Sequence, residues 1–190
     1  MMIANRLVLF LMVILTNYVC QQLAPLVGKK MPNVTTRVCY LASVIGAAYF
    51  ISGTLFFSVM HLQLVYGNVV VTNLVTAALI ALIVTGGVLA IVPGKKRYLT
   101  DHLIKTTFIS VPILTLATVT QFPYHQYMLH LATAAGMYLL FAFALSGVLT
   151  RVEIAAIPKL LQGLPLDIVT LFLFYLSFSF LNGVFFNYLF

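Results

Sequence analysis

The sequence predicts an all-α membrane protein with six transmembrane helices, and three observations support this prediction. Of the 190 residues, 63% are hydrophobic and only 7% are charged, whereas a soluble domain usually carries about 25% charged residues. Six apolar stretches each approach the roughly 20 residues that cross the hydrocarbon core. The loops between these stretches alternate in charge. Lipid is therefore expected to cover most of the chain, and each spanning segment must be helical because lipid cannot satisfy an open backbone.

The apolar stretches follow one another along the whole chain, with short polar connections. They lie near residues 7–27, 38–60, 69–92, 103–122, 127–150 and 166–190. The first stretch is too long for the apolar region of a cleavable signal peptide, so we expect it to be a spanning helix. The length fits one transmembrane domain, residues 1–190.

Basic residues are concentrated in alternate loops. The second loop, 61–68, and the fourth, 123–126, contain no Lys, Arg, Asp or Glu, and only Arg6 departs from the alternation. Lys and Arg are retained on the cytoplasmic side, so the pattern predicts a bacterial inner-membrane protein with both termini outside the cytoplasm. The net charge of +7 then reflects topology and not nucleic-acid binding, because no stripe of interleaved basic and aromatic residues is present. The basic residues of the first, third and fifth loops are Lys29, Lys30, Arg37, Lys95, Lys96, Arg97, Lys105, Arg151 and Lys159.

Three helices followed by three helices would form an inverted repeat, with pseudo-repeats of about 1–93 and 94–190. Each half opens with a polar stretch that contains a proline, Pro25 in the first stretch and Pro112 in the fourth. Proline removes a backbone donor and kinks a helix, so we expect helices one and four to be broken. Interrupted segments at matching places in two halves indicate a binding site near the midplane.

Polar side chains accompany both prolines. One interpretation is a polar lining for an ion or a quinone-headgroup path. The other is hydrogen bonding between helices, which is common in membranes and contributes about 1 kcal/mol per bond. The candidate midplane residues are Asn17, Gln21, Gln22, Thr115, Thr118 and Gln121.

Other reactive residues give weaker signals. Cys20 is either a small buried residue or a metal ligand, and Cys39 is expected to pack against neighbours. The acidic residues Asp101, Glu153 and Asp167 belong to cytoplasmic loops or edges. Ion carriers usually place a carboxylate at depth, so the chain alone is not expected to pump ions. No nucleophile–base set or phosphate-binding loop is present, so at most a non-catalytic subunit of an enzyme is predicted.

Three segments resemble the short six-helix membrane subunits of the Rnf and Nqr complexes, namely subunits A and E of the Rnf electron transport complex and subunits D and E of the NADH:quinone reductase. The longest runs from Gly147 to Val184, and the others are Phe108 to Thr115 and the surroundings of Thr16-Asn17. The resemblance implies membership of a redox-driven ion-translocating complex and pairing with a related subunit of opposite orientation. Positions that match the family pattern are Pro25, Gly28, Lys29, Lys30, Pro112, Pro158, Gly163, Leu176, Phe178 and Gly183.

The chain departs from this family where the family binds iron. Members carry one cysteine in each broken helix, and iron–sulfur clusters are held by thiolates. The first of these positions falls on Ala24 and the second on Ala117 or Thr118, so the resemblance implies a scaffold or ion-path subunit without its own iron–sulfur centre. Cys20 lies about one helical turn from Ala24 and remains the one candidate thiol near that region.

Two other functions fit the same sequence. A small-solute transporter, or the membrane substrate-binding component of a vitamin-uptake system, would use the polar residues of helices one and four to bind its solute. A structural or assembly subunit would instead bond these polar residues to each other in a dry core. In either case lipid is the main surrounding partner.

Overall fold

The structure, a computed structural model, describes six α-helices that account for residues 2–22, 34–63, 70–91, 97–119, 127–152 and 164–185. The prediction of an all-α chain with six helices is therefore confirmed, and the predicted boundaries agree to within about a turn and a half at most ends. The helices are α1 (Met2–Gln22), α2 (Val34–Gln63), α3 (Val70–Ile91), α4 (Arg97–Val119), α5 (Tyr127–Val152) and α6 (Leu164–Phe185).

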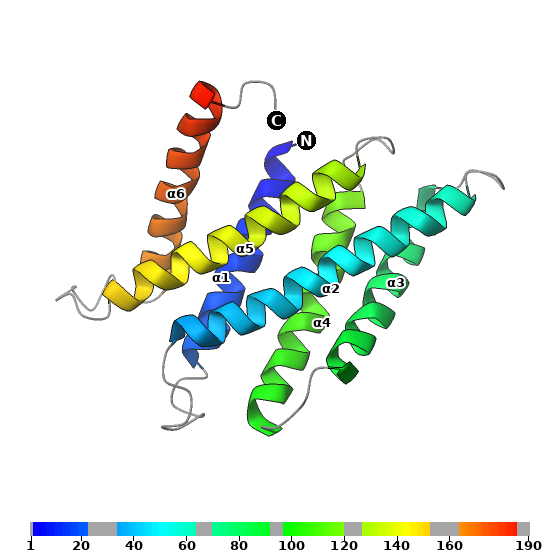
Figure 1. The fold of residues 1–190 in the computed structure, drawn as a ribbon, viewed down its shortest axis with the longest axis horizontal. Coiled ribbons are helices and arrows are strands. Elements are labelled where there is room, and N and C mark those ends of the chain that lie inside the picture. The colour runs from blue at the N-terminus through cyan, green and yellow to red at the C-terminus, as the bar shows by residue number, and fades with distance from the viewer. Residues whose placement is uncertain are drawn as a thin grey trace.

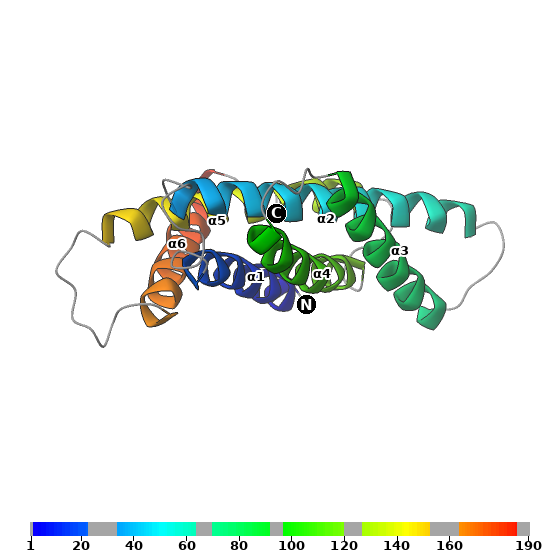
Figure 2. The ribbon, with the colours of Figure 1, turned by 90° about the horizontal axis from the view of Figure 1, so that it is seen from below.

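The helices form two layers with one helix at each flank. α2 and α5 lie side by side and run in opposite directions, and α1 and α4 cross beneath them (Figures 1 and 2). α3 packs against α2 and α4 on one flank, and α6 packs against α5 and α1 on the other (Figure 2). The starts of α2, α4 and α6 and the ends of α1, α3 and α5 all point toward the lower left of Figure 1. Successive helices therefore alternate in direction, as a chain that crosses a layer repeatedly must.

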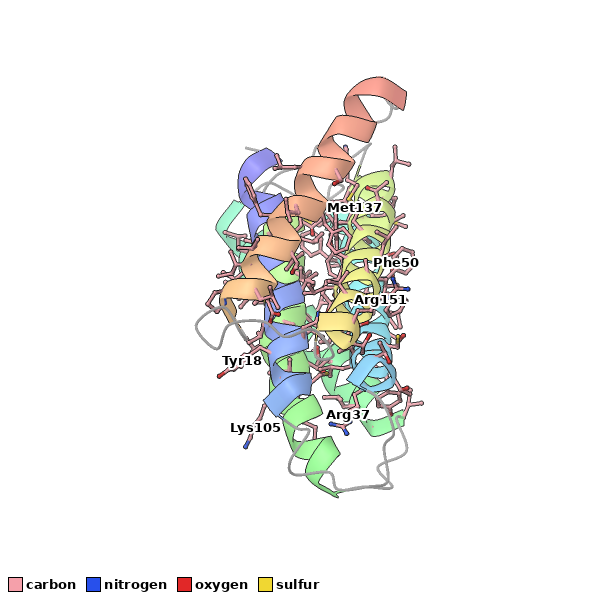
Figure 3. All side chains as sticks on the ribbon, turned by 90° about the vertical axis from the view of Figure 1, so that its left-hand side faces the viewer. Tyr18, Arg37, Phe50, Lys105, Met137 and Arg151 are labelled. Atoms are coloured by element: carbon pink, nitrogen blue, oxygen red, sulfur yellow. The ribbon has the colours of Figure 1, made fainter. Side chains whose placement is uncertain are left out.

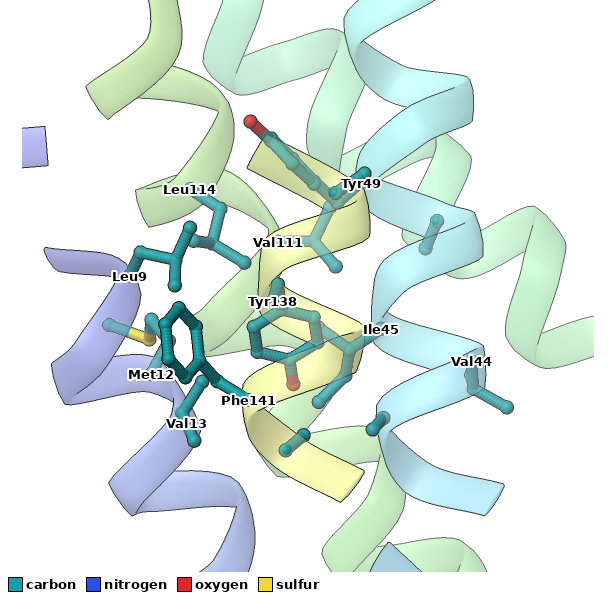
Figure 4. Packing of buried hydrophobic residues seen from close by; sticks show 14 of the residues in the cluster. Leu9, Met12, Val13, Val44, Ile45, Tyr49, Val111, Leu114, Tyr138 and Phe141 are labelled. Atoms are coloured by element: carbon teal, nitrogen blue, oxygen red, sulfur yellow. The ribbon is translucent and has the colours of Figure 1, made fainter. Parts of the chain in front are cut away.

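The apolar core lies where the four central helices meet. Leu9, Met12 and Val13 of α1 face Val111 and Leu114 of α4, with side chains of α2 and α5 closing the cluster (Figure 4). The ring of Phe10 in α1 packs on that of Phe141 in α5, with centroids 5.1 Å apart. The core thus joins both halves of the chain and depends on helices far apart in sequence.

The outer surface of the helices is apolar as well. α3 exposes Leu79 and Ile83, the latter at 73% of its possible area, and α6 exposes Phe172. Figure 3 shows side chains projecting outward from the helices, Phe50 of α2 among them. In a protein surrounded by water, an apolar surface of this extent would be unusual.

Three helices have the length and hydropathy to cross a membrane within the described residues. These segments are Thr35–Met60 of α2, Leu74–Ile91 of α3 and Tyr127–Val148 of α5. α1, α4 and α6 contribute shorter apolar segments, Val8–Cys20, Ile104–Thr118 and Pro165–Phe174.

Two charged residues lie deeper than the sequence suggested. Arg37, assigned to the first loop, is in the first turns of α2 and only 7% exposed. Asp167, assigned to the edge of the fifth loop, is in the first turn of α6 and fully buried. A carboxylate in the first turn of a helix is stabilised by the helix dipole, which favours Asp167 at this buried position in α6.

The predicted break in helix four is wrong. α4 continues through Pro112 from Arg97 to Val119. Proline costs the helix one backbone hydrogen bond, and packing against neighbouring helices lets such helices tolerate it. Here α4 packs against α1, α2 and α3, and its residues next to the proline, Val111 and Ser110, are fully buried. α1 is continuous to Gln22, and Pro25 lies outside the described residues.

Glycines allow α2 and α5 to approach closely. A Cβ atom added to Gly53 would lie 2.5 Å and 2.6 Å from the two methyl carbons of Leu131. One added to Gly46 would lie 3.0 Å from a methyl carbon of Leu139. Small residues allow this kind of close helix contact in membranes, and here they fix the spacing of the two helices in the upper layer.

Candidate functional site

Three pairs of buried hydroxyl groups connect the lower helices to the upper ones. Thr16 of α1 lies 2.8 Å from the hydroxyl of Tyr138 in α5. Thr118 of α4 lies 2.5 Å from the hydroxyl of Tyr49 in α2. Thr115 of α4 lies 2.8 Å from Ser52 of α2. None of these side chains is more than 1% exposed, so the hydroxyl pairs lie inside the helix bundle.

The direction of the two tyrosine–threonine hydrogen bonds follows from the threonine side chains. Thr16 Oγ1 donates to the carbonyl oxygen of Met12 at 2.7 Å. A hydroxyl has a single proton, so Tyr138 must be the donor to Thr16. Thr118 Oγ1 likewise donates to the carbonyl oxygen of Leu114 at 2.7 Å. Tyr49 is therefore the donor to Thr118, and both phenolic oxygens keep lone pairs open.

The two tyrosines lie on opposite sides of the apolar cluster. In Figure 4 the hydroxyl of Tyr49 points toward one end of the cluster and that of Tyr138 toward the other. Val13, Val111 and Ile45 lie in the same cluster and are fully buried. The site therefore consists of two polar groups separated by an apolar layer, one between α1 and α5 and one between α2 and α4.

Some buried polar atoms within the described helices have no hydrogen-bond partner. They are the side-chain oxygens Asn17 Oδ1 and Ser110 Oγ and the hydroxyl of Tyr127. The amide nitrogen of Asn17 donates to the carbonyl oxygen of Val13 at 3.1 Å, which orients its oxygen. A buried polar group without a hydrogen-bond partner costs about 1–3 kcal/mol. These three atoms are therefore places where the described helices do not satisfy the hydrogen-bonding capacity of a buried side chain.

Several sequence-predicted residues meet at this site, but not in the expected arrangement. Thr115 and Thr118 are fully buried and bonded to α2, and Asn17 is fully buried beside Thr16 on α1. The hydrogen bonds between helices run from Thr16 of α1 to α5 and from Thr115 and Thr118 of α4 to α2. Bonds between helices one and four were expected for a purely structural subunit. Gln21 and Gln22 belong to the last turn of α1, and Ala24 and Gln121 lie outside the described residues.

No metal centre is formed by the described part of the chain. Cys20 is 1% exposed and Cys39 half-buried, and both are free thiols. Arg37 lies close enough to Cys20 for an electrostatic interaction. Within the six described helices, no three His, Cys, Asp or Glu residues come together as a metal-binding group. Ala117 and Thr118, the positions that match the family's second cysteine, are part of α4.

The partners contributed by α2 and α5 were missed by the sequence analysis. Tyr49, Ser52 and Tyr138 were not singled out, although a signal for the tyrosines exists. Gly46-Ala47-Ala48 comes just before Tyr49, and Ala134-Ala135-Gly136 comes shortly before Tyr138. A tyrosine that follows three small residues inside an apolar helix can approach a neighbouring helix and needs a partner for its hydroxyl.

Comparisons of the chain with protein-family models, with curated proteins and with solved structures find no match.

Proposed function

We propose that the chain is an integral membrane subunit of an Rnf/Nqr-like, redox-driven ion-translocating electron transport complex. In this proposal six helices cross the inner membrane, both termini face away from the cytoplasm, and the two halves form a 3+3 inverted repeat. The subunit acts as a scaffold and ion path, has no iron–sulfur centre of its own, and pairs with a related six-helix subunit of opposite orientation.

The observation that supports the proposal best is the reciprocal pattern of contacts. When α1 is exchanged with α4, α2 with α5 and α3 with α6, the set of helix pairs in contact stays the same. The tyrosine–threonine bonds follow the same exchange, because Thr16 on α1 bonds to α5 and Thr118 on α4 bonds to α2. Reciprocal contacts are what two inverted repeats related by a pseudo-two-fold axis require.

The chemistry of α4 supports a subunit without its own cluster. Thr118, one of the two positions that match a family cysteine, is held by Tyr49 and by the carbonyl oxygen of Leu114. A hydroxyl engaged in this way stabilises contact between helices, whereas a cluster ligand must be a free thiolate. The exposed apolar surfaces of α3 and α6 provide area for lipid or for other membrane subunits.

The test is purification of the tagged chain from its native membranes, with identification of co-purifying proteins by mass spectrometry and quantitation of iron. Co-purification with redox subunits, including a second six-helix subunit, is the expected result. Recovery of a stable lone monomer without such partners would refute the proposal. Replacement of Cys20→Ser in the same preparation tests the thiol, and we expect the iron content and electron transfer of the complex to be unchanged.

Topology is tested separately with reporter fusions at the chain ends and in the loops. The loop that follows α1 should report the cytoplasm, and both ends should report the opposite side. Fusions that place an end and the loop after α1 in the same compartment would contradict six crossings.

A further inference from the structure

Asp167 is the only carboxylate among the side chains that the structure describes, and it is fully buried. The sequence placed it at the edge of a loop, next to water, but it belongs to the first turn of α6. It lies one helical turn before Leu171, which is 2% exposed and part of the apolar core. Residues four apart share one face of a helix, and α6 contacts α1 and α5. The carboxyl group therefore lies on the face of α6 that packs against the central helices.

Capping of the helix does not account for this carboxyl group. The side chain that caps a helix belongs to the residue just before its first turn, whereas Asp167 is the fourth residue of α6. The hydroxyl of Thr170 lies 2.8 Å from the carbonyl oxygen of Leu166 and 3.0 Å from that of Asp167. Its proton is therefore directed to the backbone and not to the carboxyl group.

Two opposing influences act on the charge of Asp167. Burial favours the neutral, protonated form, because an ionised carboxylate loses its hydration in an apolar interior. The first turn of a helix favours the ionised form, because its N–H groups and the helix dipole interact with negative charge. The two forms are thus closer in free energy than burial alone would make them, and a group in this situation can take up and release a proton.

The helices around Asp167 supply few other charges. On α5, Arg151 in the last turn is exposed, so water screens its effect. The described side chains of α1 include no charged residue, and the thiol of Cys20 and the phenol of Tyr18 are groups that are normally neutral at pH 7. Arg37, buried in the first turns of α2 at the same end of the bundle, adds a positive charge that favours the ionised form.

We propose that the carboxyl group of Asp167 is a proton-binding site. Binding converts the carboxylate into a neutral carboxylic acid, and no other bond changes. Ionisable residues inside membrane segments form the proton relays of pumps and transporters. The starts of α2 and α6 lie at one end of the bundle, the end that the proposed topology places toward the cytoplasm, so the proton is exchanged with that side. The inference rests on the proposed function, because it names the ion of that subunit's ion path and the residue that carries it.

The experiment uses the full-length chain in lipid nanodiscs, without other subunits, and follows its carboxyl groups by infrared difference spectroscopy during a pH titration. The chain has only three acidic side chains, Asp101, Glu153 and Asp167, so few bands overlap. Carboxyl groups in water are ionised above about pH 5, and a proton carrier must change its protonation state near the working pH. We expect one protonated-carboxyl band that is lost between about pH 5 and pH 9.

Three variants assign this band. Asp167→Asn should remove it, whereas Glu153→Gln and Asp101→Asn should leave it unchanged. Isotope-labelled aspartate in the Asp101→Asn chain labels Asp167 alone, so the band is assigned even if Asp167→Asn does not fold.

The proposal is overturned if the titrating band survives in a folded Asp167→Asn chain, if the label in the Asp101→Asn chain does not shift it, or if no carboxyl group changes its protonation state in this range. Each result would mean that Asp167 keeps one charge state and has only a structural role. Since the isolated chain is used, failure here leaves the partner test of the complex intact. Failure of the partner test likewise leaves this measurement valid.

Discussion

Replacement of Gly53 by alanine tests the contact between the two upper helices. The new Cβ would lie 2.5 Å and 2.6 Å from the methyl carbons of Leu131 and 3.1 Å from its Cγ, well inside van der Waals contact. Leu131 is fully buried, so its side chain cannot swing into free space. Overpacking of this kind costs about 1–3 kcal/mol. The better helix propensity of alanine returns about 1 kcal/mol, so Gly53→Ala should lower the free energy of unfolding by up to about 2 kcal/mol.

Gly136→Ala is the matched control on α5. A Cβ atom at Gly136 meets nothing within 4 Å, so only the propensity gain remains, about 0.5–1 kcal/mol in favour of the folded state. The assay is thermal or denaturant unfolding in mild detergent, followed by circular dichroism. The two variants should differ by about 2 kcal/mol. Equal stability would refute the close approach of α2 and α5.

A double variant sharpens the test. Leu131→Ala removes the methyl groups that the new Cβ would meet and by itself should cost about 2–5 kcal/mol. In that background Gly53→Ala should cost little, so the two changes should deviate from additivity by about 0.5–3 kcal/mol. Strict additivity would show that the two residues do not touch.

The remaining predictions concern the hydroxyl bonds and the thiols. Tyr49→Phe and Tyr138→Phe should each lower the free energy of unfolding by about 0.6 kcal/mol, the average for hydrogen bonds between membrane helices, and by at most about 1.7 kcal/mol. Tyr18→Phe, at a site 39% exposed, should have no effect in the same unfolding assay, and equal losses in all three would argue against buried bonds. Cys20, 1% exposed, should resist maleimide until the chain is denatured, whereas the half-buried Cys39 should react earlier. Mass spectrometry of timed samples decides this, and simultaneous labelling would place Cys20 outside the core.

The number and type of the helices were predictable because each apolar stretch carries its own signal. Length and composition alone separate a long apolar helix from a loop, and a helix is found at each of the six apolar stretches. The break at Pro112 was predicted from local chemistry and was wrong. The cost of one missing backbone hydrogen bond is local, whereas the packing that lets α4 continue through the proline comes from α1, α2 and α3. A prediction from the segment alone cannot include those neighbours.

The residues of the site were predictable only where the sequence alone distinguishes them from their neighbours. Asn17, Thr115 and Thr118 were identified because a polar residue within an apolar stretch stands out by itself. Tyr49 and Tyr138 are amphipathic and common in membrane helices, so they do not stand out. Their role depends on which threonine lies across the interface, and that pairing is a property of the assembled bundle.

The layered arrangement has a consequence for how the chain is made. The hydrogen bond between Thr16 and Tyr138 joins residues 122 positions apart. Leu131 of α5 packs closely against Gly53 of α2, a helix that is synthesised earlier. Contacts between distant segments form late and slow the folding of a chain. The surfaces that the first four helices present to α5 therefore stay without their partner until α5 leaves the ribosome. Helix formation and tertiary packing are separate stages for this protein, and a nascent chain arrested before α5 should have its helices but not its core.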